Sequence, residues 1–127
     1  MRQKRQMSPI KGLLPSLREK KRYLVLEVVS DSQINDFKAV SDAIWGGALK
    51  YLGEFGVAEA GIVILGEKWN PKLQRTVIRV NNKHVDKLKM ALSLIRNIDK
   101  QNVIIKSVGV SGILKKACDK FMTSKSE

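Results

Sequence analysis

The order of two hydrophobic periodicities along this chain limits the folds that it can adopt more than any other feature. Residues 22–29 place Leu24, Leu26 and Val28 at every second position, which predicts a strand. Residues 34–55 then repeat apolar side chains every three or four positions, as an amphipathic helix does. The same reasoning predicts strands at 57–67, 74–81 and 102–110. It also predicts a helix that Asn81 or Asn82 caps and that runs to about residue 97, and a last helix at 113–122.

This order is β-α-β-β-α-β with an added C-terminal helix. It predicts an α+β, ferredoxin-like (RRM-like) fold, in which both main helices cover one face of an antiparallel sheet. We therefore expect one domain at 17–123, with a loop at 68–72, followed by a polar tail at 124–127. Residues 1–16 carry helix-breaking proline and glycine without periodicity, which predicts a basic arm that is disordered until it meets a partner.

A glycine pair interrupts the first predicted helix. Gly46 and Gly47 should each cost about 1 kcal/mol against alanine, so either the helix bends there or another element packs very close to its backbone. Trp45 lies about 100° around the helix from the apolar stripe. Trp45, Gly46 and Gly47 therefore favour a contact with a protein partner, and the alternative is that the C-terminal helix covers Trp45 as core. Gly56 is the expected C-terminal cap.

The charge balance points to a polyanionic partner. The chain of 127 residues has 24 Lys and Arg against 12 Asp and Glu, a net charge of +12. Such a field attracts nucleic acid or an anionic surface, although a basic protein without a polyanion partner is the plain alternative. Four predicted RNA-binding cations stand directly before the first strand: Arg18, Lys20, Lys21 and Arg22. The arm adds further RNA-binding candidates, which are Arg2, Lys4, Arg5 and Lys11.

A second candidate anion site lies where the last strand meets the last helix. Gly109-Val110-Ser111-Gly112 is a glycine-containing turn, and backbone amides at a helix start can hold a phosphate. Lys115 and Lys116 would add charge to the first turns of that helix. Ser111, Gly112, Lys115 and Lys116 are therefore predicted to bind RNA. The alternative is that Ser111 is a plain helix cap and Gly112 a tight turn.

The open face of the predicted sheet is a weaker candidate. RNA-recognition motifs stack bases on aromatic residues of the two central strands, whereas here the first strand offers Tyr23 and the third offers none. Arg75 and Arg79 would face outward from the third strand and could contact phosphate. The alternative is a solvated edge or a salt bridge to Glu27.

Residues that could carry catalysis or hold a metal are sparse. Cys118 and His84 are the single cysteine and histidine, too few for a zinc site, and the acidic residues have no spacing that indicates acid–base catalysis. We expect no catalytic residue, no bound metal and no cofactor, with His84 an ordinary surface or capping histidine. The lone thiol, the absence of a signal-peptide pattern and short apolar runs favour a cytoplasmic protein that does not bind a membrane.

Three segments resemble a known family. LPSLREKKRYLVLEV (residues 14–28), AIWGGALKYLGEFGVAEAGIVIL (43–65) and VGVSGILKKA (108–117) resemble the archaeal ribonuclease P protein component 2 family, over about residues 14–121. The resemblance implies a non-catalytic protein subunit of the ribonuclease P endoribonuclease, which removes the 5′ leader from precursor tRNA. In that family the RNA subunit performs the chemistry with Mg²⁺.

The same resemblance implies the partners. They are ribonuclease P RNA, precursor tRNA, the barrel-fold protein component 3 and the other holoenzyme proteins, with a dimer of this chain inside a two-plus-two protein complex. Two other functions stay open from the residues alone. One is a free-standing single-stranded RNA-binding module of RRM-like fold, and the other is a small-molecule regulatory or phosphate-hydrolysing domain on the same scaffold.

Overall fold

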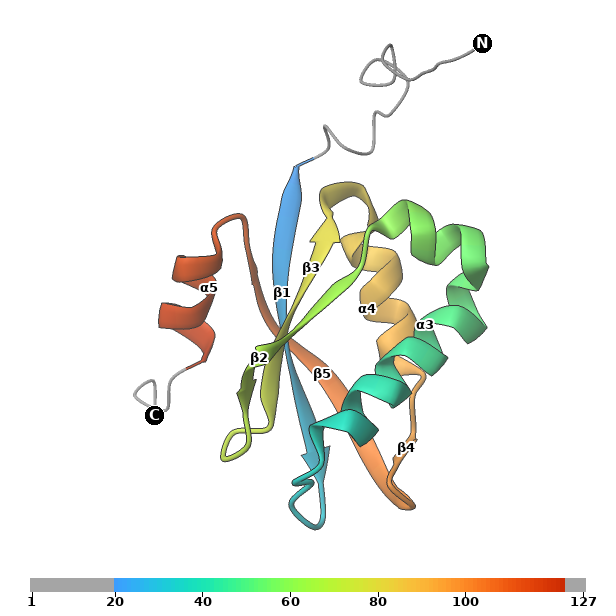
Figure 1. Ribbon diagram of the computed structural model, residues 1–127, viewed down its shortest axis with the longest axis vertical. Helices are drawn as coiled ribbons and strands as arrows, with labels where there is room; N and C mark the ends of the chain where they lie inside the picture. Colours follow the sequence, from blue (N-terminus) through green and yellow to red (C-terminus); the bar gives the residue numbers. More distant parts are fainter. Residues whose placement is uncertain (1–19, 123–127) are drawn as a thin grey trace, which may run out of the picture.

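A five-stranded antiparallel sheet forms the centre of the molecule (Figure 1), in a computed structural model that describes residues 20–122. The strands are β1 (Lys21–Ser30), β2 (Val63–Asn70), β3 (Arg75–Asn81), β4 (Asn97–Ile98) and β5 (Gln101–Ser111), in the order β2-β3-β1-β5-β4. The helices are α3 (Phe37–Ala60), α4 (Val85–Ser93) and α5 (Leu114–Phe121), with a 3₁₀ turn, η1 (Asn82–His84), before α4. The order and pairing confirm the predicted ferredoxin-like fold. The predicted arm lies outside the described residues.

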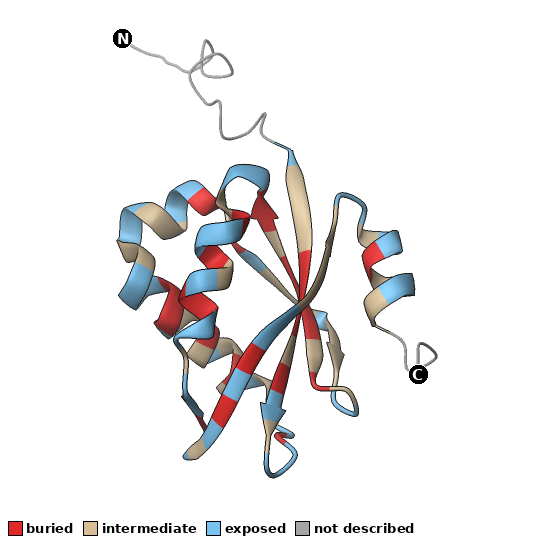
Figure 2. Ribbon diagram, turned by 180° about the vertical axis from the view of Figure 1, so that it is seen from behind, coloured by how far each residue is buried: buried red, intermediate tan, exposed pale blue. Residues whose placement is uncertain are grey.

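The main core lies between the sheet and the helix pair α3 and α4. Leu24, Leu26 and Val28 of β1 point into it, where they meet apolar side chains of both helices. Figure 2 shows the buried residues concentrated where these helices face the strands. The alternating apolar residues of the first strand and the apolar stripe of the first helix therefore pack against each other in one core.

A smaller core lies on the opposite face of the sheet, under α5. Val25 of β1, Val77 of β3 and Ala117 of α5 are fully buried there. Phe121 packs so closely on β5 that a Cβ added to Gly109 would lie 2.1 Å from its ring. The added C-terminal helix thus covers sheet surface and does not cover α3 (Figure 1).

The first helix is longer than predicted and bends at a different glycine. It runs to Ala60, with a kink at Gly53, whose φ of 76° and ψ of 170° favour glycine. The cap is Gly61, in the left-handed conformation, so the prediction that Gly56 ends the helix was wrong. Residues 57–60 are helical because valine, alanine and glutamate continue the turn until a left-handed glycine is reached.

The predicted glycine pair lies at a close approach between elements. A Cβ on Gly47 would come within 2.6 Å of the Ile95 side chain, whereas one on Gly46 would meet no atom within 4 Å. The sequence predicted either a bend or close packing of another element at this glycine pair. Close packing is found, and it applies to Gly47. The bend occurs six residues further along, at Gly53.

Two other boundaries also differ. β2 continues to Asn70, so residues 68–70 of the predicted loop are strand, and Trp69 packs on Phe37 with ring centroids 5.2 Å apart. The helix α4 ends at Ser93, because residues 97–98 pair with 101–102 as a hairpin. Asp99 and Lys100 both have positive φ in its turn, which non-glycine residues adopt rarely.

Within residues 20–122, no helix combines the length and apolar character needed to cross a bilayer.

Candidate nucleic-acid interface

The basic start of β1 is held by Asn82, the residue that follows β3. The Nε of Arg22 donates a hydrogen bond to Oδ1 of Asn82 at 2.8 Å, and the backbone amide of Asn82 donates to the carbonyl oxygen of Lys20 at 2.8 Å. Lys20 itself is exposed. Arg22 is therefore held in a defined orientation by Asn82, while Lys20 stays free to meet an anion. Arg18, the other predicted cation, lies outside the described residues.

Lys21 takes part in a second, more buried network. Its Nζ donates to Oδ1 of Asn81, and the amide nitrogen of Asn81 donates to the carbonyl oxygen of Glu59 at 2.7 Å. Asn81 is 1% exposed and packs against Gly61, so the network ties β1 to the end of α3. Lys21 thus has a hydrogen-bond partner inside the protein. Its ammonium group is therefore less available to an anion in solution than that of the exposed Lys20.

The sequence predicted a different role for the two asparagines. Asn81 or Asn82 was expected to cap the following helix through its side chain, and Asn81 makes no such hydrogen bond at the start of η1. Their side chains bind Lys21 and Arg22 across the sheet instead. Sequence reasoning missed this role because pairing of residues 21 and 81 depends on the register of two strands sixty positions apart.

The glycine-containing turn lies beside the same cations. Tyr23 of β1 pairs with Ser111 of β5, which brings the end of β5 next to the start of β1. A Cβ on Gly112 would lie 2.7 Å from a guanidinium nitrogen of Arg22. The structure therefore brings together two regions, residues 20–22 and 111–112, that the sequence offered as separate RNA anchors.

The turn itself is closed by Ser111. Its hydroxyl accepts a hydrogen bond from the amide of Ile113 at 3.2 Å and donates to the carbonyl of the same residue at 3.1 Å. The cap position of α5 is Ile113, which makes no side-chain capping bond, so Ser111 is a turn residue two positions before the cap. Lys115 and Lys116 are exposed on the first turn of α5, which contains no acidic side chain.

Arg75 has partners within the protein. Its guanidinium lies 3.1 Å from Oε1 of Glu27 and donates to the carbonyl oxygen of Phe121 at 2.8 Å. This matches the alternative of a salt bridge to Glu27. With 18% of its side chain exposed, Arg75 fastens the end of α5 to the sheet and presents little charge to a ligand.

Arg79 lies further along the same strand, away from the contact between Arg75 and the end of α5. It pairs with Tyr23 on one side and Val63 on the other, and its buried Nε has no hydrogen-bond partner among the described residues. Tyr23 packs partly against the small core under α5. The sheet face that RNA-recognition motifs use for base stacking is therefore partly occupied by a helix here.

The predicted protein contact around Trp45 divides into buried and exposed parts. Trp45 is half-buried and packs against the main core, and Gly47 is buried beneath Ile95. Gly46 is exposed and lines a hollow beside α4. The contact stays a prediction, and Gly46 is the residue of the three that a partner could reach.

Residues that could bind a metal do not converge in the described part of the chain. Within residues 20–122, no three side chains of His, Cys, Asp or Glu lie together in an arrangement that could hold a metal ion. His84 stands at the start of α4 without a side-chain capping bond and lines a groove between α3 and α4. Cys118 is a half-buried free thiol beside the small core.

Fold and surface together define a class of protein. It is a basic ferredoxin-like domain in which cations and a glycine turn meet at one end of the sheet, and in which α5 covers part of the face opposite the main helices. Comparison with known proteins gives the family. The model of the Rpp14/Pop5 family matches residues 22–122, so the chain belongs to this family.

Individual relatives agree with that assignment. The chain is 37% identical over 113 residues to ribonuclease P protein component 2 of Pyrococcus furiosus, covering 89% of this chain and 92% of the relative. The protein of the same name from Methanocaldococcus jannaschii is 33% identical, covering 89% of this chain and 81% of the relative. A chain in the cryo-EM structure of yeast ribonuclease MRP has a similar fold, with a TM-score of 0.57, 16% identity and coverage of 74% and 75%.

Proposed function

We propose that this chain is a non-catalytic protein subunit of ribonuclease P, which binds the catalytic RNA and supports Mg²⁺-dependent removal of the 5′ leader from precursor tRNA. The names of the curated relatives support the assignment to the complex. The observation that carries the RNA-binding part is the position of Arg22, held by Asn82 and packed against Gly112. A guanidinium held in a defined orientation beside a glycine-containing turn is suited to bind a phosphate oxygen.

The proposed mechanism is electrostatic. A large RNA must bring phosphate-bearing helices together to form its active conformation, and each protein cation that neutralises a phosphate releases a condensed counterion. Lys20 and Arg22 at the start of β1 and Lys115 and Lys116 on α5 would contact phosphates from two neighbouring elements. The protein would thereby stabilise the active RNA fold and lower the Mg²⁺ concentration at which the RNA works. Mg²⁺ itself belongs to the RNA in this account.

The other residues predicted to bind RNA take lesser parts in the proposal. Lys21 contributes through its position beside Asn81, and Arg79 could reach a phosphate at the uncovered end of the sheet. Arg75 is assigned to fastening α5, because its guanidinium is already paired. The expected protein partners are component 3 and the remaining holoenzyme proteins.

Reconstitution tests the proposal directly. The full chain is added to ribonuclease P RNA at limiting Mg²⁺, with and without the component 3 protein of the same organism, and 5′-leader cleavage of precursor tRNA is measured. We expect cleavage to rise only when this chain is present. Cleavage that this chain leaves unchanged under every combination would contradict the proposed function.

The main rival, a free-standing single-stranded RNA binder, is less favoured by the geometry. Such modules stack successive bases on exposed aromatic side chains. Here Tyr23 is the aromatic residue of the central strands, and it packs partly against the core beneath α5. Tight binding of the isolated chain to short unstructured oligonucleotides, comparable to its binding to ribonuclease P RNA, would favour the rival.

A further inference from the structure

Four neighbouring strands place one side chain each in a single row near the end of the sheet where β1 begins. Val63 of β2 pairs with Arg79 of β3, Arg79 with Tyr23 of β1, and Tyr23 with Ser111 of β5. Directly paired residues of antiparallel strands point to the same face of a sheet. These four residues, called the Tyr23 row from here on, therefore share the face on which α5 lies, and each is at least partly exposed.

The next row of the same face is covered by α5. Its members lie two positions away in each strand and are Leu65, Val77, Val25 and Gly109. Val25 and Val77 are fully buried together with Ala117 of α5, and Gly109 lies against the ring of Phe121. The helix therefore closes the middle of this face and leaves the Tyr23 row accessible along its edge.

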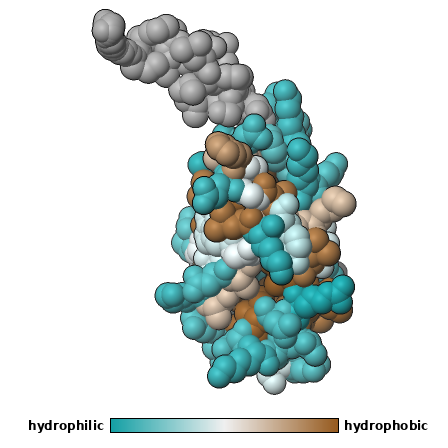
Figure 3. Space-filling model, turned by 90° about the vertical axis from the view of Figure 1, so that its right-hand side faces the viewer, coloured by the Kyte–Doolittle hydropathy of each residue, from teal (hydrophilic) through white to brown (hydrophobic). Residues whose placement is uncertain are grey.

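Exposed apolar side chains stand at both ends of the Tyr23 row. Val63 is 37% exposed at one end, and Ile113, two positions after Ser111 at the start of α5, is 52% exposed at the other. The helical side of the molecule also shows apolar side chains among hydrophilic ones (Figure 3). At the Tyr23 row they flank a tyrosine ring and two arginines, which is a combination that holds an RNA base.

The two guanidinium groups come from different strands. Arg79 lies inside the row beside Tyr23, and its buried Nε has no hydrogen-bond partner among the described residues. Arg22 is held by Asn82, and one of its guanidinium nitrogens would lie 2.7 Å from a Cβ added to Gly112. A phosphate or the polar edge of a base placed over the row would therefore meet guanidinium donors of both β1 and β3.

These features fit an unpaired nucleotide better than a double helix. A duplex presents mainly phosphate and ribose to a protein, so it would satisfy the arginines and leave Val63, Tyr23 and Ile113 without an apolar partner. An unpaired base offers its π face to the ring, and its edge and phosphate to the guanidinium groups. One accessible row with one aromatic residue suits a single base, whereas RNA-recognition motifs stack two or three.

We propose that the Tyr23 row binds one unpaired nucleotide of RNA, with the base stacked on Tyr23 and the phosphate held by Arg22 and Arg79. The nucleotide belongs to ribonuclease P RNA or to the 5′ leader of precursor tRNA, which offer the same chemistry. This inference rests on the proposed function, since it names the part of the RNA that the basic end of β1 meets. It gives Tyr23 a role in RNA affinity that does not depend on charge.

Ultraviolet cross-linking of the natural chain tests the proposal in the assembled enzyme. Light joins an aromatic ring to a base stacked on it, and mass spectrometry of the digested chain identifies the linked residue. The protein subunits are assembled with ribonuclease P RNA, with precursor tRNA, or with both. Chemical probing of each RNA shows whether the linked nucleotide is unpaired.

We expect a single nucleotide on the peptide that contains Tyr23, at an unpaired position. A link formed with ribonuclease P RNA alone places the nucleotide in that RNA, and a link that requires precursor tRNA places it in the leader. A link to base-paired nucleotides, or no link at Tyr23 in an assembly that cleaves its substrate, overturns the proposal. A chain that neither binds RNA nor stimulates cleavage removes the proposed function and this inference with it.

Substitutions separate stacking from charge. Tyr23→Phe keeps the ring and should leave affinity for RNA within about threefold, whereas Tyr23→Leu should lower it about tenfold, as loss of one base–aromatic stack does. The slope of log K against log salt should stay unchanged for Tyr23→Leu, while Arg79→Ala should lower it by up to about 1. Equal affinities of the Phe and Leu variants, or a slope that Tyr23→Leu reduces, overturn the proposal.

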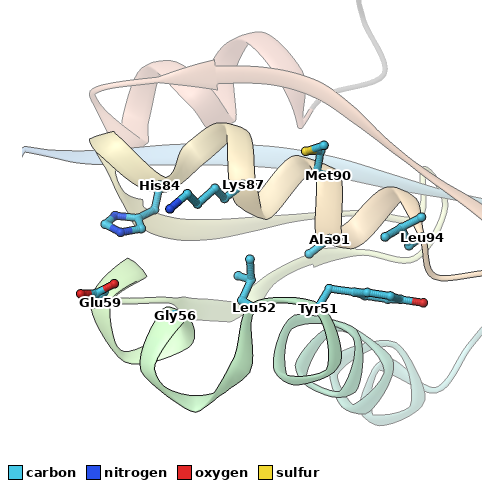
Figure 4. Close-up of a pocket in the computed structure, with 9 residues that line it drawn as sticks. All are labelled: Tyr51, Leu52, Gly56, Glu59, His84, Lys87, Met90, Ala91 and Leu94. Carbon is cyan, nitrogen blue, oxygen red and sulfur yellow. The ribbon is translucent and has the colours of Figure 1, made fainter.

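Tyr51 provides the matched control, because it is the other tyrosine of the chain and also lies beside a cation. The Nζ of Lys50 lies 5.4 Å from the centroid of its ring, and Figure 4 shows Tyr51 at a hollow between α3 and α4, on the opposite side of the sheet from α5. Tyr51→Leu should leave binding to RNA alone unchanged.

Thermal unfolding checks that each variant is folded, and the cross-link needs no variant. If Tyr23→Leu weakens binding to the other protein subunits and leaves RNA binding unchanged, the occupant of the row is a protein and the proposal is overturned.

Discussion

The Nε of Arg22 donates a hydrogen bond to the side-chain oxygen of Asn82 at 2.8 Å, across the β1–β3 pair. The guanidinium of Arg22 also lies against Gly112, which directly follows β5. Three segments that are distant in the sequence therefore define the position of one cation.

Removing the asparagine that holds Arg22 should weaken RNA binding without removing a charge. Asn82→Ala should lower affinity for ribonuclease P RNA a few-fold, because a mobile guanidinium must be ordered on binding. The slope of log K against log salt concentration should stay the same, since the number of phosphate contacts is unchanged. Filter binding at several salt concentrations measures both quantities. A slope that drops as far as that of Arg22→Ala would show that Asn82 does more than position Arg22.

Two glycines of the last strand and turn should respond differently to alanine. Gly109→Ala places a methyl group 2.1 Å from the Phe121 ring and should destabilise the protein by about 1–3 kcal/mol, as overpacking does. Gly112→Ala would push the guanidinium of Arg22, whose nearest nitrogen is 2.7 Å from the added methyl group, out of the orientation that Asn82 gives it. Stability should therefore change little while RNA affinity falls. Urea unfolding and RNA titration of both variants check the contrast. Equal loss of stability in the two would contradict it.

Arg75 should matter for stability and not for RNA. Arg75→Ala leaves Glu27 and the carbonyl of Phe121 without their donor, which should cost about 1–3 kcal/mol. The salt dependence of RNA binding should be unchanged, because this guanidinium faces the protein. Lys38→Ala is a suitable comparison, since its exposed i,i+4 pair with Asp42 should contribute under about 1 kcal/mol. A reduced salt slope for Arg75→Ala would return this residue to the RNA surface.

Alanine substitutions at the two neighbouring glycines of α3 should have opposite effects on stability. Gly46→Ala finds open space and should stabilise the protein by about 0.5–1 kcal/mol through helix propensity. Gly47→Ala would come within 2.6 Å of Ile95 and should destabilise it by about 1–3 kcal/mol. Thermal unfolding of both variants gives the answer. Stabilisation by Gly47→Ala would mean that Ile95 moves aside at no cost.

Periodicity predicted the element order and the core of this fold well, because Leu24, Leu26 and Val28 need only alternate to report a buried face. It failed where a boundary depended on backbone conformation. The pattern around Gly53, Gly56 and Gly61 offers three glycines, and nothing local tells which bends the helix and which caps it. Likewise, Asp99 and Lys100 have positive φ although neither is a glycine. No turn residue therefore marked this position in the sequence, and the β4–β5 hairpin was missed.

The candidate site was predicted in parts and not as a whole. The cations at 20–22 and the turn at 109–112 were each visible as local patterns. Their meeting was not, because it follows from the register of β1 with β5. The partners of Lys21, Arg22 and Arg75 were hidden for the same reason. Arg75 shows the limit clearly, since an outward-facing arginine looks the same in sequence whether it meets RNA or a helix end.

The salt dependence of RNA binding tests the central claim most directly. Affinity for ribonuclease P RNA is measured against salt for the natural chain and for a variant with Arg18, Lys20, Lys21 and Arg22 replaced by alanine. If these residues neutralise phosphates, the slope of log K against log salt should fall by roughly 3–4. An unchanged slope in a folded variant would contradict the account, because the cations at the start of β1 would then contact no phosphate.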